Sequence, residues 1–279
     1  MRILSLHYPL PNAQIDNKDI FNAPALFEYD VIIFHPLGFE QAIFNWLNDE
    51  EEFYTAPGEK VIQEPSGNNA RNIYEILEQR SNEIDTFLKR DGILIMYAVP
   101  EMAITADPEE PAVVQRNIFS RIRLKLFPQS SNQEAEELPN EQFSTSRYSL
   151  INFGKAFFGE NTPNDLGEGV ITNWIIPGSG FTNMTENDFN YFNKNIFQNL
   201  LRNHAKNIAY QAYFDPSIQD DSKFSVILTT VKSETIIALA ANCVYGQIFF
   251  LPCFTQASTD EAMTEARLLV NDIDFIMNK

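Results

Sequence analysis

The chain has little of several things that mark a particular chemistry. Its 279 residues include 2 cysteines and 3 histidines, and 20 Lys and Arg stand against 38 Asp and Glu. A net charge of −18 argues against neutralising nucleic-acid phosphate and against adsorbing to an anionic membrane, because both need clustered cations. We therefore expect neither direct nucleic-acid binding nor association with a membrane.

Long hydrophobic runs are missing as well. No stretch approaches the ~18 uninterrupted apolar residues of a membrane span, since even the apolar-rich run 235–254 contains polar residues and glycine. The N-terminus has too short an apolar run before Pro9 for a signal peptide. Two cysteines in a chain of this length, Cys243 and Cys253, fit buried and reduced side chains. These features predict a cytoplasmic protein.

Motifs of catalysis and of cofactor binding are missing too. The sequence has no Gly-x-Ser-x-Gly elbow, no Walker A or Gly-x-Gly-x-x-Gly motif, no His-Glu-x-x-His and no Cys-x-x-Cys. It therefore identifies no catalytic residue and predicts no cofactor and no metal site. This pattern favours a protein that is not an enzyme.

What is present is an ordinary globular composition, with 44% hydrophobic residues. The apolar runs 31–34 and 93–99 lack polar alternation, which is typical of strands buried on both faces of a parallel sheet. Just before the second run, residues 69–90 repeat apolar side chains with a helical period and stop at a glycine turn. A helix, a glycine turn and an apolar strand form half of a βαβ crossover.

The rest of the chain completes an α/β pattern. The further elements we expect are a strand at 3–6, a polar loop over 9–24, a strand at 170–176, a helix from Thr185 to His204, strands at 224–228, 235–240 and 247–252, and a helix that begins at Ser258. Residues 1–279 are thus predicted to form one α/β domain. Its single open sheet is expected to be mostly parallel, with helices on both faces and a C-terminal β-hairpin.

Residues 105–146 form an acidic, proline-rich segment that we interpret as a long insertion in this domain. Inside it, cations and aliphatic residues alternate with period two along Arg121, Ile122, Arg123, Leu124 and Lys125. Such a segment suits an amphipathic strand at a charged sheet edge, or a strand on which a protein partner docks. A helix that begins near Val113 is the third alternative.

Three polar residues follow predicted strands. His7 comes after the first strand, His35 after the second, and Glu101 shortly after the third. In open α/β sheets, ligands bind outside the carboxyl ends of the strands, so these three residues are the ligand-facing candidates. His204, near the end of a predicted helix, suits a structural role there, because a cation complements the helix dipole.

The order of these elements resembles the flavodoxin-like fold of the class I glutamine amidotransferases and their trehalose-utilisation-type relatives. The resemblance is carried by strands 2–6 and 29–34, the helix-to-strand passage 87–95 and the late run 236–252. Such enzymes have a nucleophilic Cys in a Gly-x-Cys-x-Gly elbow and a late His-x-Glu pair. Here the sequence continues as Pro100-Glu101-Met102-Ala103, and no such pair follows. The resemblance therefore implies the fold without the catalytic triad or glutaminase activity.

Three functions remain open at this stage. The leading hypothesis is a non-catalytic α/β binding module, an accessory or interaction subunit of a cytoplasmic protein assembly whose partner and oligomeric state the sequence does not specify. The alternative is a small-molecule-binding protein or hydrolase-like enzyme with a site near His7 and His35. The third is an acidic decoy for a basic, DNA-binding surface. Convergence of the two histidines with an acid would favour the second hypothesis.

Overall fold

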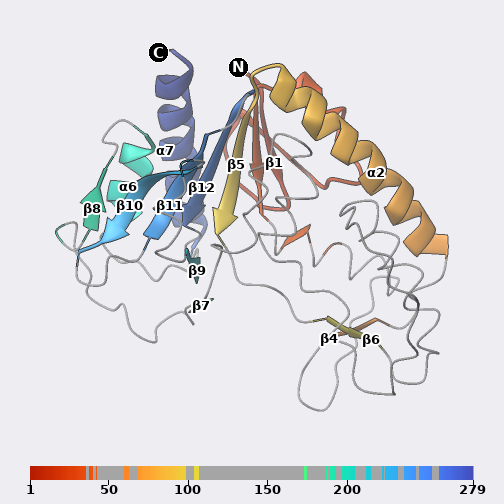
Figure 1. Cartoon of the computed structure of the whole chain (residues 1–279). Coiled ribbons are helices and arrows are strands. Elements are labelled where there is room, and N and C mark those ends of the chain that lie inside the picture. The colour runs from red at the N-terminus through yellow and green to blue at the C-terminus, as the bar shows by residue number, and fades with distance from the viewer. Residues whose placement is uncertain are drawn as a thin grey trace.

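A computed structural model gives the arrangement of the chain (Figure 1). It describes residues 1–35, 38–39, 42, 60–62, 68–98, 104–106, 173–174, 187, 189–192, 196–204, 212–214, 222, 224–231, 236–242, 245–252 and 258–278. The strands of its main sheet are β1 (Ile3–Leu6), β2 (Ile15–Lys18), β3 (Val31–Phe34), β5 (Ile93–Ala98), β8 (Phe189–Tyr191), β10 (Phe224–Thr230), β11 (Ile236–Ala241) and β12 (Gln247–Pro252). The helices are the short 3-10 helix η1 (Leu26–Glu28) and the α-helices α2 (Asn68–Lys89), α6 (Gln198–His204) and α7 (Thr259–Met277).

The eight strands of the main sheet run in the order β2-β1-β3-β5-β12-β11-β10-β8. The four neighbouring pairs from β2 to β12 are parallel, and the three from β12 to β8 are antiparallel. Two short ladders form separate sheets, one of β4 (Lys60–Ile62) with β6 (Ile104–Ala106) and one of β7 (Asn173–Trp174) with β9 (Ala212–Tyr213). The second adjoins the main sheet, because Phe214, directly after β9, bridges to Ile236 of β11. The α/β class is confirmed, and the main sheet is mixed. A mostly parallel sheet with helices on both faces stays a prediction.

The parallel half of the sheet contains the apolar runs that the sequence indicated. Every residue of β1, β3 and β5 is buried. In register, Ile33 of β3 pairs with Ile95 of β5, which pairs with Phe249 of β12. β-Branched and aromatic side chains suit strands that are covered on both faces, which explains why these runs show no alternation.

Helix α2 follows its predicted bounds closely. Its C-terminal half buries Ile84, Phe87 and Leu88, and the helix packs against η1. It ends where Asp91 adopts a φ of 62° and the N–H of Gly92 bonds the Phe87 carbonyl. These are the left-handed residue and the returning hydrogen bond of a helix C-cap.

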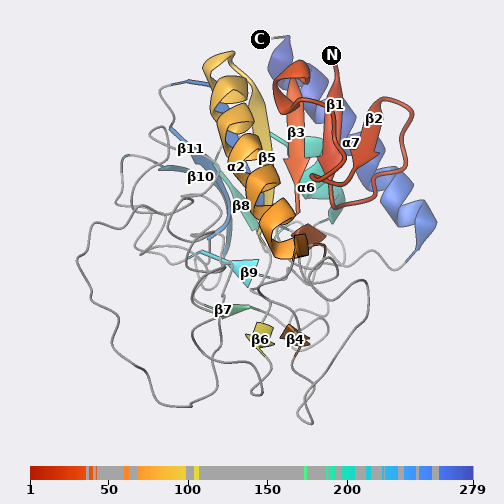
Figure 2. The same cartoon turned by 90° about the vertical axis from the view of Figure 1, so that its right-hand side faces the viewer.

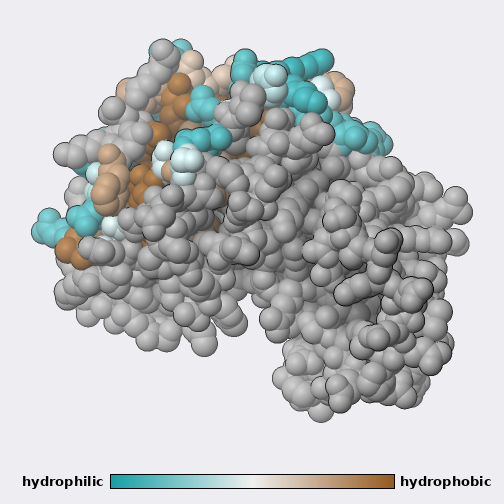
Figure 3. Space-filling model, in the orientation of Figure 1, coloured by the Kyte–Doolittle hydropathy of each residue, from teal (hydrophilic) through white to brown (hydrophobic). Residues whose placement is uncertain are grey.

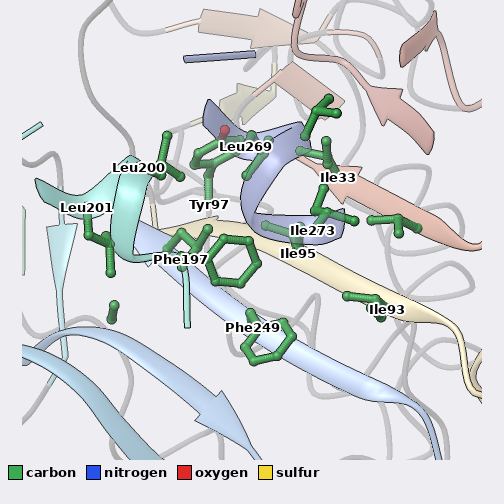
Figure 4. Packing of buried hydrophobic residues seen from close by; sticks show 14 of the residues in the cluster. Ile33, Ile93, Ile95, Tyr97, Phe197, Leu200, Leu201, Phe249, Leu269 and Ile273 are labelled. Atoms are coloured by element: carbon green, nitrogen blue, oxygen red, sulfur yellow. The ribbon is translucent and has the colours of Figure 1, made fainter. Parts of the chain in front are cut away.

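The C-terminal part forms consecutive hairpins and a capped helix. β10 pairs antiparallel with β11, and β11 with β12, so the predicted hairpin is present. α7 begins at Ser258, whose side chain accepts from the backbone N–H of Glu261 at 3.3 Å, as an N-cap does. α6 and α7 contribute to one buried hydrophobic cluster with the sheet, in which Tyr97 lies between Leu200 and Leu269 (Figure 4).

Two predicted elements are wrong. Within the expected polar loop 9–24, residues 15–18 form β2, an edge strand parallel to β1 of which only Ile15 is buried. In place of a helix from Thr185, residues 189–191 form β8 and α6 begins at Gln198. The carboxylate of Asp272, on α7, accepts the N–H of Leu200 at 2.8 Å and so satisfies the first turn of α6. A cap supplied from a distant helix leaves no local signal in the sequence.

Of the helices in the described part of the chain, none is long and apolar enough to cross a membrane. On the face shown in Figure 3, hydrophilic residues cover the C-terminal part of α2, and hydrophobic ones are visible on the left of the view, where Figure 1 draws α7 and the strands β10, β11 and β12. The prediction of one domain with an insertion at 105–146 stays a prediction, since 107–146 lie outside the described residues.

Candidate functional site

The candidate site lies where β1 and β3 end, side by side. Strand β2, which follows β1 in the chain, lies on one side of β1, and the next strand, β3, lies on the other side of β1. The strand order therefore reverses at β1 (Figure 2). Crevices at such reversals, outside the carboxyl ends of parallel strands, are where open α/β sheets bind ligands. His7 follows β1 directly and His35 follows β3 directly.

His7 is held in an unusual backbone conformation by a network of local bonds. Its φ is 61°, in the left-handed region that non-glycine residues seldom adopt. Its Nε2 accepts the backbone N–H of Ile20 at 3.2 Å, and its Nδ1 lies 4.0 Å from a carboxylate oxygen of Asp19. Phe21 and Phe39 meet the ring edge to face at centroid distances of 6.3 and 5.7 Å. Burial lowers the pKa of His7 from 6.5 to about 4.

His35 accepts two backbone N–H groups from the residues that follow it. Its Nδ1 accepts the backbone N–H of Gly38 at 3.0 Å, and its carbonyl accepts that of Phe39 at 3.1 Å. A Cβ at position 38 would collide with the carbonyl of His7, so a glycine is needed for the two segments to approach. The pKa of His35 is also lowered to about 4, first by burial and then by the neighbouring His7.

Beside His35 lie two tyrosines, which bond a glutamate. The rings of Tyr8 and His35 stack in parallel, with centroids 4.9 Å apart and 5° between their planes. Tyr97, in β5, contacts both rings, at 4.8 Å from Tyr8 and 5.9 Å from His35. Both phenols donate to the carboxylate of Glu265 on α7, Tyr8 at 3.1 Å and Tyr97 at 2.8 Å. Glu265 is only 1% exposed. We call these five residues the His–Tyr–Glu cluster: His7, Tyr8, His35, Tyr97 and Glu265.

The hydrogen bonds define the protonation of the imidazoles. A nitrogen that accepts a backbone N–H carries no proton, so neutral His7 has its proton on Nδ1 and neutral His35 has its proton on Nε2. Protonation of either ring would remove its acceptor, in agreement with the lowered pKa values. At neutral pH the two rings are therefore uncharged N–H donors. The hydroxyl of Ser5, in β1, donates to the Tyr8 carbonyl at 2.6 Å and supports the same turn.

The structure brings together two of the three ligand-facing candidates. Glu101 lies outside the described residues, as does the docking segment 121–125. His204 is the last residue of α6, at the helix end where we expected it. Within the described ranges, no group of three or more His, Cys, Asp or Glu side chains could hold a metal ion.

Sequence reasoning missed Tyr8, Tyr97 and Glu265. Tyr97 belongs to an apolar strand and Tyr8 to a loop, where an aromatic residue needs no special explanation. Glu265 carried the one available signal, because it lies in the helical stripe of Ala262, Ala266 and Leu269 that α7 buries. An acidic residue among buried helix positions indicates a hydrogen-bond donor in the core that satisfies its carboxyl group.

Comparison with known proteins does not assign the chain to a family. No family model matches the chain, and no curated protein matches it. Among solved structures, it is similar to a cytoplasmic protein from Salmonella typhimurium, with 13% sequence identity and a TM-score of 0.37 over 99% of this chain and 98% of that one.

Proposed function

We propose that this chain is a small-molecule-binding protein whose site lies at the carboxyl ends of β1 and β3. The observation that carries the proposal is that His7 and His35 both lie at the reversal of the strand order, and that His35 stacks on Tyr8, whose hydroxyl bonds the buried acid Glu265. The order β2-β1-β3-β5-β12 is that of flavodoxin-like sheets, which bind their ligand at this edge. The resemblance to the class I glutamine amidotransferase-like fold is part of the same proposal.

The concentration of polar groups supports a site. Two imidazoles, two phenols and a carboxylate are gathered at one sheet edge, and burying such groups is unfavourable unless they are bonded to one another or to a ligand. Clusters of buried titratable groups with perturbed pKa values are frequent at binding and catalytic sites.

The low pKa values of the two imidazoles favour a binding role over hydrolysis. A general acid or base works best with a pKa near the operating pH, whereas the pKa values of His7 and His35 are about 4. Ser5, the serine of β1, donates its hydroxyl proton to the Tyr8 carbonyl, which is not the arrangement of an activated nucleophile. Uncharged N–H groups suit hydrogen bonding to an oxygen of a ligand.

The interaction-module hypothesis stays a prediction. It depends on the insertion 105–146 and on the docking segment 121–125, nearly all outside the described residues. The two hypotheses make different predictions about the isolated chain. A binding protein takes up a small molecule beside His35, whereas a module with no site of its own does not.

A protein-observed NMR screen of small-molecule fragments on the full chain tests the proposal. We expect the fragments that bind to shift the ring signals of His7, Tyr8 and His35 together. Tyr29 serves as an internal reference, because it precedes β3 and bonds Asp16 at the opposite, amino-terminal edge of the sheet. Its signals should stay unchanged.

Two variants complete the test. His35→Asn keeps a side-chain acceptor for the Gly38 N–H but loses the imidazole, and should weaken binding at least about tenfold, or 1.4 kcal/mol. Tyr29→Phe, which removes one hydroxyl at the far edge, should leave affinity unchanged. Fragments that bind and shift other residues while leaving the three rings unchanged would contradict the proposal, and so would a screen without any bound fragment.

A further inference from the structure

We propose that Glu265, on the C-terminal helix α7, is a positioning residue that sets the orientation of His35 by anchoring Tyr8. The inference rests on the proposed function only where it concerns ligand binding, because the contacts among Glu265, Tyr8 and His35 are present without a ligand. The chain of contacts has two links. The Tyr8 hydroxyl donates to Glu265 at 3.1 Å, and the Tyr8 ring stacks on His35 at 4.9 Å.

The first link ties together distant parts of the chain. Glu265 lies 257 residues after Tyr8 and 168 residues after Tyr97, and its carboxylate accepts from both hydroxyls. A carboxylate that is 1% exposed would be strongly destabilising without such donors. Because the two hydroxyls bond different oxygens of this carboxyl group, Glu265 holds both phenols at once.

The second link turns that anchor into an orientation for His35. Tyr8 is fixed at its hydroxyl by Glu265 and at its carbonyl by the Ser5 hydroxyl, at 2.6 Å. The plane of the Tyr8 ring is therefore fixed, and the His35 ring lies 5° from parallel to it. The Gly38 N–H fixes His35 at Nδ1, on one edge of the imidazole. The stack determines the plane in which the other ring nitrogen points.

Orientation of this kind matters because a functional side chain has to be held by its neighbours. A binding group is effective when its rotamer is locked by packing and by the hydrogen bonds of surrounding residues. Tyr8 and Glu265 supply this support for His35 from two elements that are remote in sequence. Docking of α7 and the geometry of the site are thereby coupled.

The alternative is that Glu265 only stabilises the fold, and α7 provides a matched control for it. Asp272 is another acid of the same helix, 3% exposed, and its carboxylate accepts from the backbone N–H of Leu200 and from Asn199. It joins α7 to α6 in the way that Glu265 joins α7 to the strands. Loss of either acid should destabilise the chain, but only Glu265 is linked to the Tyr8 ring.

The test measures the carbon-bound ring protons of His35 by NMR in the ligand-free chain. Stacking on Tyr8 places these protons over an aromatic face, where ring current shifts their signals upfield. In Tyr8→Phe we expect the upfield shift to decrease, because the ring loses its hydroxyl anchor while staying in place. In Glu265→Gln an amide N–H replaces one of the two acceptor oxygens, so the anchor weakens and the shift should decrease in the same direction. In Asp272→Asn we expect the wild-type value.

The double variant Tyr8→Phe/Glu265→Gln separates a shared pathway from two independent effects. If Glu265 acts through Tyr8, the double variant should shift the His35 signals no further than Tyr8→Phe does. Should Glu265→Gln not fold, Tyr8→Phe alone decides the matter, since it removes the anchor and leaves Glu265 bonded to Tyr97.

Unchanged His35 signals in Tyr8→Phe, or equal changes in Glu265→Gln and Asp272→Asn, would overturn the inference. Because no ligand is present, these results do not depend on the proposed function. If fragments fail to bind but the His35 signals move as expected, the proposed function fails and the positioning role stands. If fragments bind at His35 and its signals do not respond to Tyr8→Phe, the reverse holds.

Discussion

Acid should weaken the folded state through His7 and His35 before most carboxylates are protonated. In the folded chain both pKa values are about 4, against 6.5 for an exposed histidine. Between these values the unfolded chain binds more protons than the folded chain. Stability contributed by the two neutral rings is therefore fully present above pH 6.5 and is lost progressively as the pH falls toward 4.

The expected magnitude follows from the same values. A pKa of 6.5 in the unfolded chain and about 4 in the folded chain corresponds to a loss of about 2 kcal/mol per histidine between pH 7 and pH 5. For the two rings together the loss is about 4 kcal/mol. This is a large part of the 5–15 kcal/mol that typically separates a folded domain from its unfolded state.

Urea denaturation at pH 7, 6 and 5 measures this loss, and two isosteric variants assign it. In His35→Asn the amide oxygen can replace Nδ1 as acceptor for Gly38, and in His7→Gln it can replace Nε2 as acceptor for Ile20. Each variant should reduce the loss between pH 7 and pH 5 by about 2 kcal/mol relative to the unmodified chain.

Two aspartates act in the opposite direction. Burial raises the pKa of Asp19 and of Asp272 above 3.8, so protonating these carboxylates favours the folded chain as the pH falls through that raised range. Comparing His35→Asn with the unmodified chain at the same pH cancels this contribution, since both aspartates keep their partners. In His7→Gln only the Asp272 contribution cancels, because Asp19 lies 4.0 Å from the replaced ring. If His35→Asn and His7→Gln lose as much stability at pH 5 as the unmodified chain, then the neutral buried imidazoles are not the cause.

Four further substitutions, the third of them a control for the second, concern stability and are checked by the same denaturation experiment at pH 7. Leu94→Ala, in β5 between β3 and β12, should cost about 2–5 kcal/mol, and a loss below ~1 kcal/mol would remove it from the core. Arg80→Met should cost about 3–5 kcal/mol, because the buried guanidinium pairs with a buried carboxylate at 2.6 Å and bonds three backbone carbonyls. Lys89→Met, which breaks an exposed ion pair of the same helix, should cost less than ~1 kcal/mol, and equal losses would refute the distinction. Gly246→Ala should cost about 1–3 kcal/mol, because φ is 65° and a Cβ would lie 2.7 Å from a backbone oxygen; an unchanged midpoint would contradict this.

Much of the parallel half of the sheet was predictable because each of its elements is encoded locally. The runs 31–34 and 93–98 are apolar throughout, and α2 carries its own period and its own stop signal. The position of His7 and His35 followed from the same logic, since the residue after a parallel strand must lie at its carboxyl edge.

The antiparallel edge was harder to predict. Residues 189–191 carry a pattern that suits a helix, yet they pair with β10 as β8. The start of α6 depends on Asp272, more than seventy residues away in sequence. When a helix or strand is stabilised mainly by a partner that is distant in sequence, its local residue pattern does not indicate that the element forms there.

The sequence by itself determined the α/β class, most strands of the main sheet and the edge at which polar residues would gather. Tertiary structure alone decided what gathered there. Tyr8 and Tyr97 meet Glu265 because α7 packs against β5, and neither phenol has a sequence signal for a partner in that helix. Periodicity reports which faces are buried, since burial follows from the local backbone geometry. The choice of partner for a buried polar group depends instead on how whole elements dock.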